Sequence, residues 1–321
     1  MTASTCRRAL AVLSAALLAA CTELPARQPA AGEAPYFSAN DARPRLALVL
    51  SSGSLRGFAH VGVLKVLEAN GIRPDLVVGS SVGALVGAIS ASGRPAAELQ
   101  AIVSADDFRL GSGLSRVSLG TERPSVHDFI ERNVRSQRIE RFPVPFAAVA
   151  TEMQKGCLAV FNAGAAAVAV QASTGLPGVF APTTIDNHEY ADGGITSPVP
   201  VRVARALGAE RVIAVDVTFP PGEWKPDGMV DRLFQMGLVM LRTLAMQEAR
   251  EADVLIEPVF PPPSQINLAN RAALIEVGER AALAALPRIR RMLDEPMTPV
   301  ATRVNDPRWC QSSPPLTAAL R

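Results

Sequence analysis

Ser81 stands at the centre of Gly79-Ser80-Ser81-Val82-Gly83, a G-x-S-x-G sequence that can present a serine as a nucleophile. An apolar run precedes it and an apolar helical segment follows. Small residues on either side let strand and helix backbones approach and hold the serine in a strained turn. At a helix N-terminus, free N–H groups favour an alkoxide and the oxyanion that it generates. The alternative interpretation is a glycine-rich turn in which Ser80 and Ser81 cap the helix.

The loop Ser51 to Gly57 follows the preceding predicted strand, a position that supplies oxyanion-hole amides in serine hydrolases. We predict that the amides of Gly53 and Ser54 hold a tetrahedral oxyanion, with the charge of Arg56 nearby. A dinucleotide-binding loop is the competing interpretation. It is disfavoured because serines replace two glycines of G-x-G-x-x-G, and because the second strand ends in Gly79-Ser80 without an acidic residue.

Asp192 is the candidate base. An α/β-hydrolase triad needs a histidine after the acid, but the last histidine of the chain is His188. The carboxylate of Asp192 could instead take the Ser81 proton directly across about 2.6 to 3.2 Å. Gly193 and Gly194 would keep that approach open. Asp-Gly-Gly is more often a simple turn, so this prediction depends on its order after the serine and the loop.

These three motifs, in this order, resemble the patatin-like phospholipase family, whose Ser-Asp dyad dispenses with histidine. The resemblance covers about Arg45 to Arg290 and includes four further passages. These are Arg56 to Leu64, Ala150 to Glu152 with Gly156, Ala172 to Pro182, and Val212 to Val217. It implies a three-layer α/β/α fold with a mainly parallel sheet, no cofactor and no metal. It also implies a set of structural motif glycines, which are Gly57, Gly79, Gly83, Gly193 and Gly194.

One departure from the family concerns its loop G-G-G-x-R/K-G, where Ser52 and Ser54 replace the first and third glycines. Serine can replace glycine without backbone strain where φ is negative. The replacement is harder at Ser54 if that residue is a left-handed oxyanion donor. The departure bears on the oxyanion hole and not on the dyad.

The elements that position these motifs form a β-loop-α-β-turn-α unit with parallel strands. Residues 46–50 form a continuous apolar run, typical of a strand buried on both faces. A helix from Phe58 ends at Asn70-Gly71, a second strand covers 76–79, and a helix covers 84–92.

Later segments predict further elements. A charged segment from Asp106 to Arg141 is either a lid or a variable insertion, with a surface helix at 125–133. The helix 231–248 carries an apolar stripe whose methionines we interpret as core filler and not as a membrane face. A late strand at 252–257 and a closing helix at 272–293 complete the domain.

The N-terminal segment predicts export and anchoring. Two arginines and an apolar run from Ala9 to Ala20 precede Cys21, so residues 1–20 resemble a bacterial lipoprotein signal peptide. We expect lipidated Cys21 to tether the protein to a membrane through a flexible segment, 21–43. Thr22 favours the outer membrane, facing the periplasm. The hydrolase domain would cover 44–295 and a C-terminal tail 296–321.

The charge balance and the cysteine content bear on nucleic-acid binding, on disulfide formation and on metal binding. The chain has 32 basic and 30 acidic residues, and residues 1–20 hold two arginines and no acids, so the mature chain is balanced at 30 against 30. This balance disfavours nucleic-acid binding. Cys157 and Cys310 are either a disulfide or two buried thiols, and no cysteine or histidine spacing suggests a metal site.

Two functions from different classes follow. One is a lipid-anchored serine hydrolase that cleaves phospholipid, lysophospholipid or related esters through an acyl-enzyme. The other is a non-hydrolytic envelope lipoprotein that uses the same fold for lipid binding or scaffolding. Intact Ser81 and Asp192 favour the first, and the serine-substituted loop is the support for the second.

Overall fold

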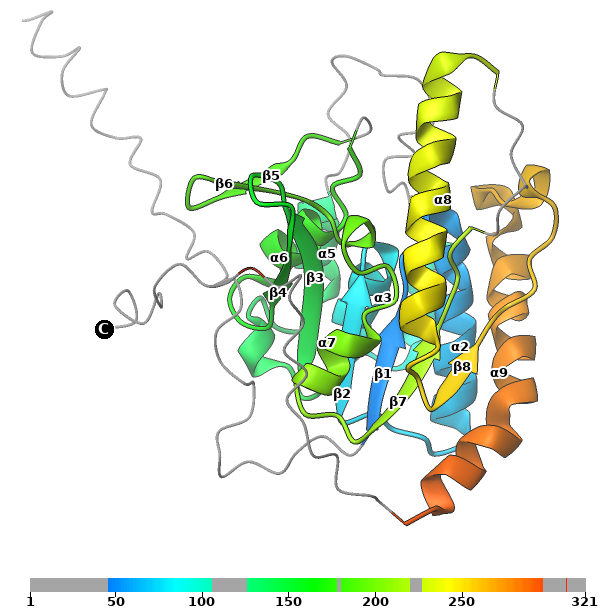
Figure 1. Ribbon diagram of the computed structural model, residues 1–321. Helices are drawn as coiled ribbons and strands as arrows, with labels where there is room; N and C mark the ends of the chain where they lie inside the picture. Colours follow the sequence, from blue (N-terminus) through cyan, green and yellow to red (C-terminus); the bar gives the residue numbers. More distant parts are fainter. Residues whose placement is uncertain (1–45, 106–125, 178–179, 220–226, 297–309, 311–321) are drawn as a thin grey trace, which may run out of the picture.

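A central sheet organises the computed structural model, which describes residues 46–105, 126–177, 180–219, 227–296 and 310 (Figure 1). Its strand order is β5-β6-β3-β2-β1-β7-β8, with β4 paired to β3. The strands are β1 Leu46–Leu50, β2 Leu76–Ser80, β3 Phe146–Glu152, β4 Cys157–Phe161, β5 Thr183–Ile185, β6 His188–Asp192, β7 Arg211–Val215 and β8 Val254–Ile256.

The pairing of β2, β1, β7 and β8 is parallel, and β3 joins β2 in the same direction. Strands β4, β5 and β6 pair antiparallel at the β3 side. In register, Leu50 at the end of β1 lies between Gly79 of β2 and Val215 of β7. The segments that follow these three strands therefore leave the same edge of the sheet, and the predicted mainly parallel fold is confirmed.

Helices cover both faces of the sheet. Alternate residues of β1 point to opposite cores: Leu46, Leu48 and Leu50 into one, Ala47 and Val49 into the other. The helices are α2 Phe58–Ala69, α3 Val82–Ala91, α4 Ala96–Ser104, α5 Val126–Asn133, α6 Ala166–Ser173, α7 Val201–Ala206, α8 Met229–Ala249 and α9 Arg271–Asp294. The first core holds residues of α2 to α6 and α9, and the second holds α7 and the end of α8. This is the predicted three-layer arrangement.

The helices α2 and α9 lie against each other with their backbones in contact. A Cβ atom on Gly62 would lie 2.0 Å from the Ile275 carbonyl oxygen, and one on Gly278 would lie 1.9 Å from the Ala59 oxygen. Small residues at both positions thus allow the predicted closing helix, observed at Arg271–Asp294, to dock on the helix that follows the Ser51 to Gly57 loop.

Helix α8 differs from the prediction. Its methionines were expected in the core, but Met236 and Met240 are 60% and 71% exposed. The physical reason is its position: only the C-terminal end, at Ala245, Glu248 and Ala249, is buried, and every earlier described side chain of α8 is at least partly exposed. In Figure 1 the N-terminal part of α8 (yellow) extends beyond the sheet.

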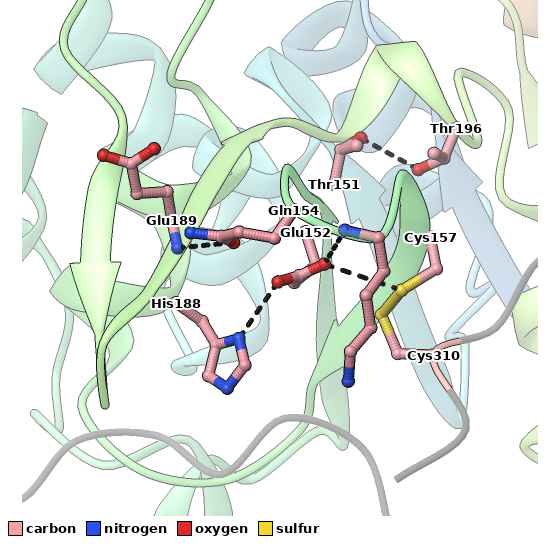
Figure 2. Close-up of a disulfide and its surroundings, with 9 residues drawn as sticks. Thr151, Glu152, Gln154, Cys157, His188, Glu189, Thr196 and Cys310 are labelled. Carbon is pink, nitrogen blue, oxygen red and sulfur yellow. Dashed lines mark hydrogen bonds and ion pairs between the residues drawn. A yellow bond between two sulfur atoms is a disulfide. The ribbon is translucent and has the colours of Figure 1, made fainter. Parts of the chain in front are cut away.

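Cys157 and Cys310 form a disulfide, which decides between the two predicted alternatives. Figure 2 shows the bond beside the turn between β3 and β4. There buried Glu152 accepts a hydrogen bond from the Lys155 amide at 2.7 Å and pairs with His188 Nδ1 at 3.0 Å. The amide of Cys310 also donates to the Leu158 carbonyl at 3.0 Å, so this residue is fixed to β4 by backbone as well as by sulfur.

Several predicted segments lie outside the described residues. They are the signal peptide, Cys21 and the tether within 1–45, most of the candidate lid at 106–125, and the tail apart from Pro296 and Cys310. The predicted surface helix is present as α5, with Phe129 and Ile130 buried against the domain. Across the described ranges, none of the helices combines the length and apolarity needed to span a membrane.

Candidate active site

Ser81 occupies the sharp turn between β2 and α3. Its backbone has φ 55° and ψ −125°, a strained conformation for a residue with a side chain, and Ser81 is the N-cap of α3. The turn is tight because a Cβ on Gly83 would lie 2.0 Å from the Leu50 carbonyl oxygen. A Cβ on Gly79 would lie 2.4 Å from the Gly83 oxygen. The structure thus shows the strand-to-helix elbow that the G-x-S-x-G spacing predicts.

Asp192 lies directly beside Ser81. The Ser81 hydroxyl donates to Asp192 Oδ2 at 2.5 Å, and the Gly194 amide donates to Oδ1 at 2.7 Å. Asp192 is only 5% exposed and is the last residue of β6. Its backbone is held by the Gly175 carbonyl, which accepts from its N–H at 3.0 Å, and by Thr151 Oγ1, which donates to its C=O at 2.9 Å.

Burial raises the pKa of Asp192 from 3.8 to about 6. The hydrogen bonds from Ser81 and Gly194 act in the opposite direction, because they stabilise the carboxylate. At neutral pH the group remains largely ionised, and its proton affinity lies closer to the working pH than that of an exposed aspartate. These are the properties that a general base needs.

Ser173, to which the sequence assigned no catalytic role, contacts the elbow. Its fully buried hydroxyl accepts a hydrogen bond from the Ser81 amide at 2.9 Å and donates to the Val149 carbonyl at 2.5 Å. It therefore ties the elbow to β3 and is a positioning residue. The only sequence signal was its place at the start of a family-like passage, Ala172 to Pro182, which says nothing of its partner.

The candidate oxyanion loop begins directly after β1. Gly53 is required by a close approach, since a Cβ there would lie 2.4 Å from the Val217 carbonyl oxygen. Ser54 has φ 52°, the left-handed conformation in which serine is the harder exchange, whereas Ser52 is not among the positive-φ residues. Within the described part of the chain, the amides of Gly53 and Ser54 donate to no acceptor.

Arg56 is held by residues that follow β7 and β8. Its side chain is fully buried, and Nη1 donates to the Thr218 carbonyl at 3.1 Å. The guanidinium carbon lies 4.6 Å from the ring centre of Phe219 and 4.9 Å from that of Phe260. Thr218 and Phe219 belong to the segment after β7, which itself contacts Gly53 through Val217, and Phe260 follows β8. These contacts give Arg56 a role in supporting the loop, and its predicted charge effect on an oxyanion stays a prediction.

His60 lies under the same loop. Its Nε2 is 3.0 Å from the Ser51 carbonyl oxygen, an acceptor, so Nε2 carries the proton. Complete burial lowers the pKa of His60 to about 4. The imidazole is therefore neutral at physiological pH and donates a hydrogen bond to the backbone of the loop.

The segment after β7 also connects the site to α8. Asp216 accepts hydrogen bonds from the Thr218 amide at 2.9 Å and from Arg242 Nη1 at 2.5 Å. One residue earlier on α8, Leu241 Cδ1 lies 3.1 Å from where a Cβ of Gly194 would stand. Helix α8 thus contacts both the segment that supports the oxyanion loop and Gly194, two residues after the base.

Two groups of described side chains are close enough together to share a metal ion. One consists of Glu152 with Cys157 and Cys310, whose sulfurs are consumed in the disulfide. The other is His127, Asp128 and Glu131 on the outer side of α5. Neither group includes Ser81 or Asp192.

The fold and the site together define an α/β protein with a serine elbow and a buried carboxylate partner. Residues 48–205, about half of the chain, match the family model described as patatin-like phospholipase. That range contains the Ser51 to Gly57 loop, the elbow and the Asp-Gly-Gly turn. The chain belongs to the patatin-like phospholipase family.

Relatives match about half of the chain. An uncharacterized NTE family protein of Mycobacterium bovis is 34% identical over 177 residues, which cover 54% of this chain and 49% of that protein. Patatin-like phospholipase domain-containing protein 6 of Homo sapiens is 34% identical over 182 residues, covering 54% of this chain and 13% of that protein. The chain thus spans about half the length of the mycobacterial relative that it matches.

Among solved structures, VipD from Legionella pneumophila is similar, with a TM-score of 0.44 and 14% sequence identity. The match covers 85% of this chain and 72% of that chain.

Proposed function

We propose that this protein is a serine acyl-ester hydrolase that acts on lipid esters through Ser81 and Asp192. The observation that carries the proposal is the 2.5 Å hydrogen bond from the Ser81 hydroxyl to a buried Asp192 carboxylate at a strained elbow. Membership of the patatin-like phospholipase family supports lipid esters as the substrate class.

In the proposed acylation step, Asp192 takes the hydroxyl proton as Ser81 Oγ attacks the ester carbonyl carbon. The carbonyl electron pair moves to oxygen, and the amides of Gly53 and Ser54, which have no described acceptor, would receive this oxyanion. Collapse of the intermediate expels the alcohol, which takes the proton from Asp192. A water molecule, deprotonated by the same carboxylate, then hydrolyses the acyl-enzyme.

Helix α3 assists the same step. Ser81 is its N-cap, so the positive end of the helix dipole lies at the nucleophile. Ser173 and Gly194 fix the serine backbone and the carboxylate, respectively. No described histidine contacts either member of the dyad, which fits direct proton transfer from serine to aspartate.

Phospholipid, lysophospholipid and simpler carboxylic esters are the proposed substrates. We further propose, from the sequence of residues 1–43, that lipidated Cys21 anchors the protein in the bacterial outer membrane facing the periplasm. A cleaved signal would also deliver the chain to an oxidising compartment, where the Cys157 to Cys310 disulfide is stable.

The test is covalent labelling by a fluorophosphonate probe combined with turnover of a short-chain nitrophenyl ester. We expect Ser81→Ala to lose both, and Asp192→Asn to lose turnover by at least about a hundredfold, the range of general-base catalysis. Ser90→Ala, on the same helix α3, is the matched control and should behave as the parent chain. Normal turnover by Ser81→Ala would refute the dyad, and an unlabelled, inactive parent chain would favour the non-hydrolytic alternative.

A further inference from the structure

The N-terminal half of α8 presents an apolar stripe to solvent. Met229, Leu233, Met236 and Met240 are 77%, 62%, 60% and 71% exposed. Their spacing of four, three and four residues places them on one side of the helix. A contiguous row of large exposed apolar side chains is unusual on a soluble surface and marks a site of interaction.

This stripe begins next to the candidate active site. Leu241 approaches Gly194, and Ile195, the following residue, is itself 45% exposed. From Leu241 to Met229 the helix rises by about 18 Å at roughly 1.5 Å per residue. Because β7 and β8 are parallel and α8 connects them, this part of the helix extends past the edge of the sheet at which Ser81 lies (Figure 1).

The charge of the helix suits a lipid surface. Within the span of the stripe, α8 contains one acidic residue, Asp231, which at about 100° per residue lies on the opposite side of the helix, and from Arg232 to Gln247 it contains none. Its two cations in this stretch are Arg232, which is exposed, and Arg242, which is paired with Asp216. An apolar face with arginine and without carboxylates can enter the boundary between headgroups and acyl chains and tolerates anionic lipid.

The size of the stripe argues against a stable protein partner. Specific protein interfaces bury about 800 Å² on each partner and involve roughly 20 to 30 residues on each side. Four side chains along one helix fall well short of that. A bilayer needs no matching shape, and an amphipathic helix lies in its interface at a depth of about 5 to 10 Å.

We propose that the stripe formed by Met229, Leu233, Met236 and Met240 docks the protein on a phospholipid bilayer. Docking there places the edge of the sheet that holds Ser81 against the lipid surface. The proposal deepens the proposed function, since it states how a lipid ester in a bilayer reaches the dyad. It depends on the exposed face of α8 and not on the chemistry of Ser81.

A reporter on the stripe tests the docking without any catalysis. In the full chain, Met236→Cys carries an environment-sensitive nitrobenzoxadiazole label, and Leu283→Cys on α9, 55% exposed, is the matched control. The parent chain, labelled in the same way, gives the background. With vesicles of phosphatidylcholine and phosphatidylglycerol, we expect emission at 236 to rise and shift to shorter wavelength, while emission at 283 stays unchanged.

Each other occupant gives a distinct outcome that overturns the proposal. Emission at 236 that is already blue-shifted without lipid would show that a segment of this chain covers the stripe. A shift that grows with protein concentration in the absence of vesicles would show a second copy. No response of either label to vesicles would show that the stripe does not meet the bilayer.

Turnover provides the second measurement. Met236→Asp should lose about tenfold or more of its activity on vesicular phospholipid, because an apolar side chain that the bilayer would bury is exchanged for a charge. Its turnover of a soluble nitrophenyl ester should equal that of Leu283→Asp. Equal loss on both substrates would overturn the docking role. A vesicle-responsive label in an inactive protein would refute the proposed function alone.

Discussion

Gly83 in α3 and Gly237 in α8 are both helical glycines, but their surroundings are opposite. In α3, a Cβ on Gly83 would lie 2.0 Å from the Leu50 carbonyl oxygen, whereas in α8 a Cβ on Gly237 would meet nothing within 4 Å. The first glycine is imposed by backbone contact between the elbow and β1. The second lies beside the exposed stripe. The elbow is thus determined by the packing of the domain, and the free half of α8 is not.

The attachment of each region to the domain shows the same difference. The elbow is held on two sides, by Ser173 at the Ser81 amide and by Asp192 at its hydroxyl. Helix α8 is held at its C-terminal end, where buried Glu248 accepts hydrogen bonds from Ser197 Oγ at 2.8 Å and from the Val199 amide at 3.1 Å. Substitutions in the elbow should therefore affect folding and activity together, and those in the free half of α8 should not.

The largest effect is expected for Gly83→Ala. The added methyl group would overlap the backbone of β1, which cannot move without disturbing the sheet, so we expect a loss of about 3 kcal/mol or more in the free energy of unfolding. Urea unfolding followed by circular dichroism measures it. A midpoint equal to that of the parent chain would show that the elbow tolerates a side chain, and the comparison with α8 would fail.

An intermediate effect, dependent on pH, is expected for Asp192→Asn. The folded pKa of about 6 exceeds the ordinary 3.8, so the folded state binds more protons between these values. The contribution of this carboxyl to stability is therefore complete below about pH 4 and is lost as the pH rises through 6. Removing the charge should stabilise the protein by at most about 3 kcal/mol at pH 8.

The same variant should show little gain at pH 4, where the native carboxyl is already protonated. Thermal unfolding at the two pH values measures the difference. A stability gain of equal size at both values would mean that desolvation of the Asp192 charge is not its source. Together with the loss of ester turnover, the expected result would show that the ionised Asp192 carboxylate lowers the free energy of unfolding while it is required for activity.

The smallest effect is expected for Gly237→Ala. Alanine is favoured over glycine inside a helix by up to about 1 kcal/mol, and no neighbour opposes the methyl group. We expect a slightly higher urea midpoint and unchanged turnover of soluble esters. Destabilisation would reveal a contact on α8 and would remove the contrast with Gly83.

The elbow was predictable from sequence because its constraints are local. Gly79 and Gly83 allow the turn, and the apolar runs on either side identify the strand and the helix. The Ser51 to Gly57 loop and Asp192 follow from parallel strands whose ends meet at one edge. Only the order of the three motifs connects residues separated by more than a hundred positions, and that order came from a family resemblance.

The remaining features depend on tertiary distances that no local pattern encodes. Arg56 contacts the rings of Phe219 and Phe260, which are remote from it in sequence. The apolar residues of the α8 stripe have the same helical spacing as those of a core helix. Whether they are buried therefore depends on whether the helix lies over the sheet or extends beyond it, which the spacing does not show. Ser173 and the Cys157 to Cys310 bond likewise required strand pairings that periodicity leaves open.

The disulfide closes a covalent ring that runs from residue 157 to residue 310, a sequence separation of 153. Asp192 lies inside this ring and Ser81 lies outside it. A protease that cuts the chain once at any peptide bond within the ring therefore leaves both fragments in one molecule, with the two members of the dyad still covalently connected. In a compartment that preserves the bond, a nicked protein would survive as a single species, and reduction would separate its pieces.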